Sequence, residues 1–259
     1  AQRVYVHTYT GERLLGAFQP AAKPTHLLTD EERKKQMTVD DLFIDLGMSG
    51  EEVKRRVQLG DPVTMARSAE IIGGNVVSKT LDNRLSVFSM LEALKVLHSH
   101  QCDIYAVATV QEEVGLRGAV TAAYELKPDI GLALDVTLAG DYPGGVEQDR
   151  VTQLGQGTAI KIMDGSLICH PKLVRHFRDV AEAHDIPYQL EILPRGGTDA
   201  GGIQRSRGGV PSFTLSTPCR YVHTVNEMAS IRDIEASINL LAAYLEEAHT
   251  RTYGYADEA

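Results

Sequence analysis

The chain is acidic and has the composition of an ordinary globular protein. Its 259 residues are 43% hydrophobic, which is enough to bury a sizeable core within one or two domains. Thirty-five acidic residues against 26 basic ones give a formal net charge of −9. That charge offers no broad attraction to phosphate backbones or anionic lipid, so nucleic acid and membranes are not expected partners.

The cysteines and the apolar runs indicate where the protein works. Cys102, Cys169 and Cys219 lie far apart and outside any CxxC pair, so they predict neither a disulfide framework nor a structural zinc site. No run approaches the roughly 20 apolar residues that cross a bilayer. The first residues alternate and carry charge instead of forming a signal-peptide core. We therefore expect a cytoplasmic protein.

Residues 1–64 hold short alternating or apolar runs that are broken by Gly and Pro. This pattern predicts a small β-rich domain. Two short helices are expected on it, because Thr29 and Ser49 are each followed by acidic residues in the manner of a helix N-cap. The predicted strands are Arg3–Thr8, Arg13–Phe18 and Asp41–Gly47.

From residue 65 to 259 the pattern changes to strands that alternate with helices, which predicts an α/β domain with at least some parallel pairing. Apolar residues at helical spacing mark the helices, and short β-branched runs mark the strands. Helices are expected over 83–99, 116–125, 171–184 and 231–249, and strands over 104–110, 130–134, 158–163, 189–193 and 212–215.

Three acidic positions come at the ends of these elements. Glu112 and Glu113 follow the apolar run 104–110, and Asp135 follows the run 130–134. In open α/β sheets, ligands collect beyond the carboxyl ends of the strands. The strand before Asp135 has no packing use for a charge, so a metal ligand is the better interpretation there. Asp82 precedes a helix and fits an N-cap and a ligand equally well.

Glu112 and Glu113 are adjacent like charges that leave an apolar strand together. They repel each other and lose solvation unless a cation or a shared proton compensates. Neighbouring side chains on an extended backbone point to opposite sides, so one Glu could bind a metal while the other reaches a water that the metal holds. The pair predicts a ligand and a general base.

One of the nine histidines stands out by its position. His223 follows a predicted strand and the Pro218 turn, on the same side as the acids; a ligand role and a structural one are equally open. Oxygen donors with one imidazole suit Zn²⁺, Co²⁺ or Mn²⁺, and an Asp that bridges two such ions is common in hydrolysis.

Other chemistries fit the sequence less well. The Gly-rich run 196–202 lacks the Lys of a phosphate-binding loop, and Asp199 within it reads as a helix cap. A GxSxG elbow is absent, and no Cys has a base beside it, which disfavours nucleophilic catalysis. A glycosidase needs two separated carboxylates, whereas Glu112 and Glu113 are adjacent.

Five ordered motifs resemble the M42 glutamyl-aminopeptidase-like metallopeptidases, whose members assemble as tetrahedral dodecamers. The resemblance covers essentially the whole chain. It implies two divalent ions per subunit, zinc or cobalt with manganese as a further option, and peptide substrates that lose their N-terminal residue. It also implies a homo-oligomer. The motifs are Ser78–Arg84, Val110–Gly115, Ala133–Val136, Arg195–Gly201 and Arg220–Thr224.

The resemblance also implies a role for each site residue. Asp82 would bridge the two metals, and Asp135 would bind one of them. Glu113 and His223 would bind the other, and Glu112 would be the general base. The implied fold is an α/β, three-layer catalytic domain with a mixed, largely parallel sheet. A small β-barrel-like domain over residues 1–64 would serve oligomerisation and substrate access.

One departure from the family concerns a further metal-binding His, which the family places in an HxD motif upstream of the β domain. His7 and His26 do not fit this motif. We expect that an N-terminal part of the catalytic domain is missing from this chain. Two alternatives stay open: a related metal-dependent deacylase or carboxypeptidase that uses the same cluster, and a non-catalytic assembly subunit.

Overall fold

The computed structural model describes residues 2–21 and 23–254. The chain divides into two compact units, residues 1–68 and residues 69–259. Within the described residues, no helix is long and apolar enough to cross a membrane. The three cysteines are free, as expected, and Cys169 and Cys219 are buried.

The first unit is built on a four-stranded antiparallel sheet in the order β3-β2-β1-β4. Val4 and Val6 of β1 are buried on one face of this sheet. Two short helices, α1 and α2, begin after the N-caps Thr29 and Ser49, as predicted. The bounds are β1 Gln2–His7, β2 Arg13–Pro20, α1 Asp30–Lys34, β3 Leu42–Asp45, α2 Gly50–Arg56 and β4 Val63–Met65.

The expected barrel-like closure of this unit is wrong for the residues that the structure describes. A barrel closes only when its two outermost strands pair with each other. Here β3 and β4 lie at opposite edges of the sheet, with β2 and β1 between them, and each is paired on one side only. The sheet is therefore open.

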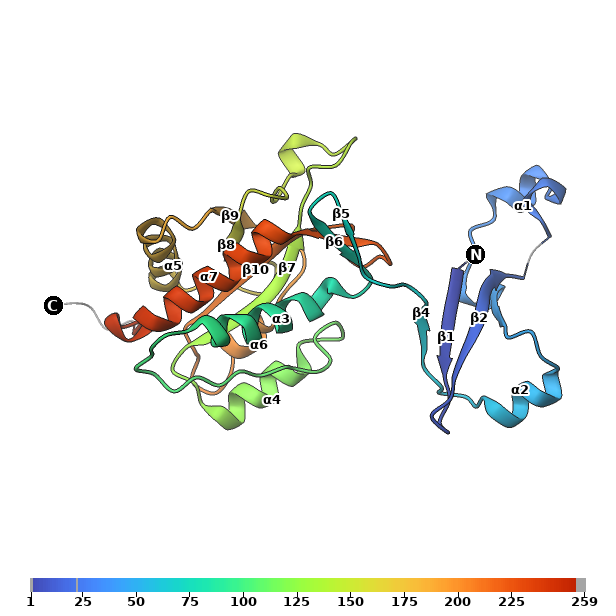
Figure 1. Ribbon diagram of the computed structural model, residues 1–259, viewed down its shortest axis with the longest axis horizontal. Coiled ribbons are helices and arrows are strands. Elements are labelled where there is room, and N and C mark those ends of the chain that lie inside the picture. Colours follow the sequence, from blue (N-terminus) through green and yellow to red (C-terminus); the bar gives the residue numbers. More distant parts are fainter. Residues whose placement is uncertain (1, 22, 255–259) are drawn as a thin grey trace. The chain divides into compact units, whose positions relative to one another are not determined.

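The second unit holds a seven-stranded mixed sheet in the order β5-β6-β11-β10-β8-β9, and β7 pairs with β10 (Figure 1). The long strand β10 is its centre, because Leu215 is paired with Leu134 of β7 and with Ile160 of β8. The strands are β5 Glu70–Ile72, β6 Asn75–Ser78, β7 Gly131–Leu138, β8 Thr158–Met163, β9 Tyr188–Ile192, β10 Ser212–Arg220 and β11 Glu227–Ser230.

The prediction of a largely parallel sheet is wrong, although the sheet is mixed as expected. Only β7 with β10 and β8 with β9 pair in parallel among the described strands. The antiparallel pairs β5 with β6 and β10 with β11 are hairpins, and short connections can join only antiparallel strands. β10 also pairs antiparallel with β8. β11 joins the two hairpins by pairing antiparallel with β6.

The segment 104–110, predicted as a buried strand, forms no strand in the structure. It runs without ladder partners, and large side chains on it are exposed, among them Tyr105 at 62% and Val110 at 66%. A β-branched run becomes a strand only where a sheet edge accepts it. The backbone carbonyl of Val110 instead accepts a hydrogen bond from Gly118 N at the start of a helix.

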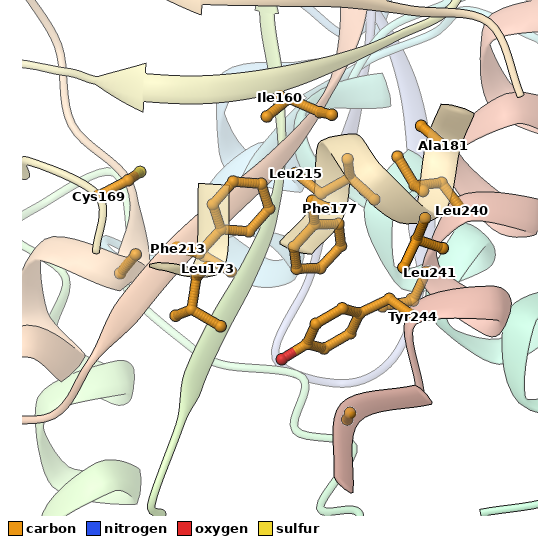
Figure 2. Close-up of a cluster of buried hydrophobic side chains, with 14 of the residues drawn as sticks. Ile160, Cys169, Leu173, Phe177, Ala181, Phe213, Leu215, Leu240, Leu241 and Tyr244 are labelled. Atoms are coloured by element: carbon orange, nitrogen blue, oxygen red, sulfur yellow. The ribbon is translucent and has the colours of Figure 1, made fainter. Parts of the chain in front are cut away.

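The core of this unit lies between β10 and two helices, α5 and α7. The ring of Phe177 stacks on Phe213 at 4.1 Å and on Tyr244 at 4.0 Å between centroids, and all three are buried (Figure 2). Leu215 adds to the same cluster. The helices are α3 Leu81–Val96, α4 Arg117–Leu126, α5 Pro171–Ala183, α6 Asp199–Gln204 and α7 Ile231–Glu247.

Helices cover both faces of the sheet, as the alternating directions of successive side chains in β10 show. Phe213 faces α5 and α7, whereas the next side chain, Thr214, points to the opposite face. There its hydroxyl lies 2.9 Å from that of Thr198, the N-cap of α6. The unit is therefore a mixed α/β fold, and its loops at the end of β7 and β10 are free to carry polar side chains.

Candidate metal centre

Asp82 is presented by an irregular helix start. The chain leaves β6 and passes through Thr80, whose backbone is left-handed at φ 53°. Asp82 and Asn83 within the first turn of α3 have non-helical backbone angles, so the regular helix begins after them. The Asp82 carboxylate lies 3.1 Å from Nε2 of His223. Its side chain therefore turns toward other polar groups and not along the helix.

Glu112 and Glu113 lie on a tight turn. Gln111 before them is left-handed at φ 59°, and the carbonyl of Glu112 accepts hydrogen bonds from the amides of Gly115 and Leu116. The two acids are therefore carried by a turn and not by the predicted strand end. Glu113 Oε2 comes within 3.4 Å of His223 Nε2.

His223 lies on the loop between β10 and β11. The loop is held by its own hydrogen bond, in which Thr224 N donates to Tyr221 O at 3.1 Å. One ligand atom from each of Asp82, Glu113 and His223 lies within 4.8 Å of the other two. The structure thus brings together three of the four side chains predicted to bind metal.

Asp135 is buried beside this group. Its strand β7 continues to Leu138, so Asp135 lies inside the strand and not at its end as the sequence suggested. Its Oδ1 accepts hydrogen bonds from Val136 N at 2.8 Å and from the side-chain amide of Asn83 at 3.0 Å. Asn83 follows Asp82 directly, so it connects the two acids.

The cluster carries more negative charge than its surroundings stabilise. Burial raises the pKa of Asp82 to about 6, and the charge of Glu113 adds to the rise. Burial and the charge of Asp199 raise the pKa of Glu112 to about 7. The pKa of Asp135 is raised well above its ordinary value, again mainly by burial. A bound cation would favour the ionised form of every one of these carboxyls.

A cavity of about 460 Å³ opens beside the cluster. Its lining includes the acids Asp82, Glu112, Glu113 and Asp199. It also includes apolar side chains of α3 and β7 such as Met90 and Leu132. Asp199 is the first residue of α6 and accepts a hydrogen bond from Thr109 Oγ1 at 2.5 Å. The acids therefore face an open space and are not enclosed within the core.

Asp82, Glu113 and His223 thus offer a mixed oxygen and nitrogen donor set, and Glu112 lines the cavity beside them. The family model of the M42 glutamyl aminopeptidases matches residues 1–240. The chain belongs to this family. The resemblance that the five motifs carry is thereby confirmed.

Relatives of this M42 chain include proteins of bacteria and archaea. A protein of Acetivibrio thermocellus is 44% identical over 211 residues, which cover 81% of this chain and 63% of that protein. A lysyl aminopeptidase of Pyrococcus furiosus is 35% identical over 254 residues, which cover 95% of this chain and 70% of the relative. The chain thus spans about two thirds of the length of these relatives.

Solved structures give the same result. An aminopeptidase of the archaeon Desulfurococcus kamchatkensis superposes with a TM-score of 0.89 and 42% identity, covering 95% of this chain and 68% of that one. The TET1 peptidase of Pyrococcus horikoshii, described as assembling into a tetrahedron or a large octahedral shell, gives 0.81 and 32% identity, covering 95% and 72%.

Two residues that touch the site were missed at the sequence level. Asn83 reads as an ordinary helix opening, and its bond to Asp135 depends on the pairing of distant segments. Glu227 is 2% exposed and accepts hydrogen bonds from the backbone of both Asp82 and His223. Its only sequence signal is a position four residues after His223, which is weak by itself.

Proposed function

We propose that this M42 chain carries the metal centre of a dinuclear aminopeptidase that removes N-terminal residues from peptides. The observation that carries the proposal is the convergence of Asp82, Glu113 and His223, whose ligand atoms lie within 4.8 Å of one another. Family membership supports the choice of reaction. The names of relatives, a lysyl aminopeptidase among them, support it further.

The residues fit a pair of divalent cations. Glu113 and His223 would bind one ion and Asp135 the other, with Asp82 between them. The fit rests on the donor set and on the raised pKa of Asp82 and Asp135, since these carboxyls gain most from a nearby positive charge. Carboxylates with an imidazole suit Zn²⁺, Co²⁺ or Mn²⁺.

Glu112 would act as the general base. When bound, the ions would supply a polarised carbonyl and a more acidic water. Glu112 lines the cavity beside the cluster, and a cation bound there would keep its carboxylate ionised and able to accept a proton. Its carboxylate would accept the proton of the attacking water and pass it to the leaving amine.

Assembly is a second part of the proposal. The TET1 peptidase of Pyrococcus horikoshii is described as assembling into a tetrahedron or a large octahedral shell, and the superposition covers 95% of this chain. We propose that this protein is also a homo-oligomer, a dodecamer by family resemblance, and that the small N-terminal unit contributes to oligomerisation and substrate access. Light scattering on the purified protein measures the assembly mass directly.

A pair of neighbouring variants tests the catalytic assignment. Glu112→Gln removes the base without removing a proposed ligand, so it should keep bound Zn²⁺ and lower turnover by about two to four orders of magnitude. Glu113→Gln is the matched control, because it should lose both metal and turnover. Near-normal turnover of Glu112→Gln would show that another group is the base.

The substrate class needs its own assay. Peptides with a free amino terminus should be cleaved, whereas the same peptides acetylated at the N-terminus should not. Preferential hydrolysis of acylated amino acids would indicate a deacylase, and release of C-terminal residues a carboxypeptidase. A wild type that binds no added Zn²⁺ and cleaves none of these substrates would favour an assembly subunit.

A further inference from the structure

Glu227 is a buried carboxylate that no part of the proposed reaction uses. It opens β11, is 2% exposed, and is paired in the sheet with Ser78, the last residue of β6. From Ser78 the chain runs directly to Asp82, and Glu227 itself follows the loop that carries His223. The side chain therefore stands where two separate segments leave the sheet.

Each carboxylate oxygen of Glu227 accepts a hydrogen bond from one of these segments. The amide of Asp82 donates to Oε2 at 3.1 Å, and the amide of His223 donates to Oε1 at 2.9 Å. One side chain thus connects the backbones of two of the three residues whose ligand atoms converge. A carboxylate can do this because both of its oxygens accept, whereas an amide side chain has one acceptor and one donor.

Both segments need an external restraint. Thr80 before Asp82 is left-handed at φ 53°, and Tyr221 and His223 have φ of 59° and 63°. Residues other than glycine rarely adopt this region, and they persist in it where surrounding contacts hold them. The Asp82 and His223 side chains are 3.1 Å apart at their closest atoms, so small shifts of either backbone would separate them.

We propose that Glu227 is a positioning residue that fixes the spacing of Asp82 and His223 for a divalent cation without binding the cation itself. The inference rests on the proposed metal centre and adds a residue behind it. Groups that orient metal ligands contribute to affinity although they do not touch the ion.

Asp233 provides a matched control elsewhere in the same unit. It is also fully buried, and it accepts hydrogen bonds from two backbone amides, those of Gly155 and Gly157, both at 2.7 Å. Asp233→Asn and Glu227→Gln therefore make the same chemical change, from carboxylate to amide, at two side chains that each accept hydrogen bonds from two backbone amides. Only Glu227 connects to the cluster.

Hydrogen exchange of the metal-free protein tests whether Glu227 holds the backbone amides of Asp82 and His223. In Glu227→Gln at least one of the Asp82 and His223 amides should exchange faster, while Gly155 and Gly157 keep their wild-type rates. Asp233→Asn should give the reverse pattern. Unchanged exchange at both Asp82 and His223 would overturn the proposal. Glu227→Asp is the second variant if Gln does not fold, because its shorter side chain cannot reach both amides.

Zn²⁺ titration then tests the consequence. Glu227→Gln should weaken Zn²⁺ binding roughly 10- to 100-fold, the range found for groups that orient metal ligands, and Asp233→Asn should bind as the wild type does. Equal weakening in both variants, or none in Glu227→Gln, would refute a positioning role. A further outcome is that the wild type binds Zn²⁺ and cleaves no peptide while Glu227→Gln binds Zn²⁺ more weakly. That result would support the positioning role of Glu227 and refute only the aminopeptidase function. If the wild type itself bound no Zn²⁺, the positioning role would fail with the metal centre.

Discussion

The crowded carboxylates should make the metal-free protein less stable as the pH rises, and Asp82→Asn should relieve part of this. The Asp82 side chain is 11% exposed, and its pKa is raised from 3.8 to about 6 in the folded chain. The unfolded chain therefore loses this proton first, and folding stability falls between these two pH values. The shift corresponds to about 2–3 kcal/mol at pH 8.

Urea unfolding in the presence of a chelator measures this difference. At pH 8 metal-free Asp82→Asn should exceed the wild type by about 2–3 kcal/mol in the free energy of unfolding, and near pH 3.5 the gap should close. With Zn²⁺ added the order should reverse, because only the wild type would gain binding free energy. A metal-free variant that is less stable than the wild type at pH 8 would refute the electrostatic reasoning.

Two further predictions concern the interior of the second unit and use the same unfolding assay. Phe177→Ala should lower the free energy of unfolding by about 3–5 kcal/mol, because Phe177 is fully buried between two rings. Phe88→Ala, at a side chain of the same unit that is 50% exposed, should change it by less than about 1 kcal/mol, and similar losses in the two variants would contradict the packing account. Lys161→Met should lower the free energy of unfolding by about 3–5 kcal/mol, because it leaves the charge of Glu191 buried without its cation. Adding Glu191→Gln should recover most of this loss, and a double variant as unstable as the single one would refute the pairing of Lys161 with Glu191.

Helices were predicted well because their signals are local. Thr29 caps α1 through bonds to Glu32 three residues away, and Ser49 caps α2 in a similar way. The apolar residues that form one face of α7 likewise all lie within a single segment. Each of these elements needs only its own residues to be recognised.

Sheet features were harder because they depend on distant partners. The run 104–110 has strand composition, yet it pairs with no strand in the described chain. The parallel or antiparallel sense of each pair likewise depends on topology and not on composition. The sequence of residues 1–64 likewise shows the same short apolar runs whether the sheet closes into a barrel or stays open.

Site residues could be predicted where an acidic side chain lies next to an apolar run. They could not be predicted where their role depends on contacts between distant segments. Asp135 and the Glu112–Glu113 pair were conspicuous as acids next to apolar runs. Glu227 was not, because its bond to Asp82 joins residues 145 positions apart. The meeting of His223 with Asp82 and Glu113 became visible only with the pairing of β10, β11 and β6.

The most direct test of the metal centre is a calorimetric Zn²⁺ titration of the chelator-treated wild type beside His223→Ala. The imidazole lies 3.1 Å from Asp82 and 3.4 Å from Glu113, so its removal takes away the one nitrogen donor of the group. We predict saturable binding to the wild type that weakens at least roughly 100-fold in the variant, more than for a residue behind the ligands. Equal Zn²⁺ affinity in the two proteins, or none in the wild type, would contradict the account.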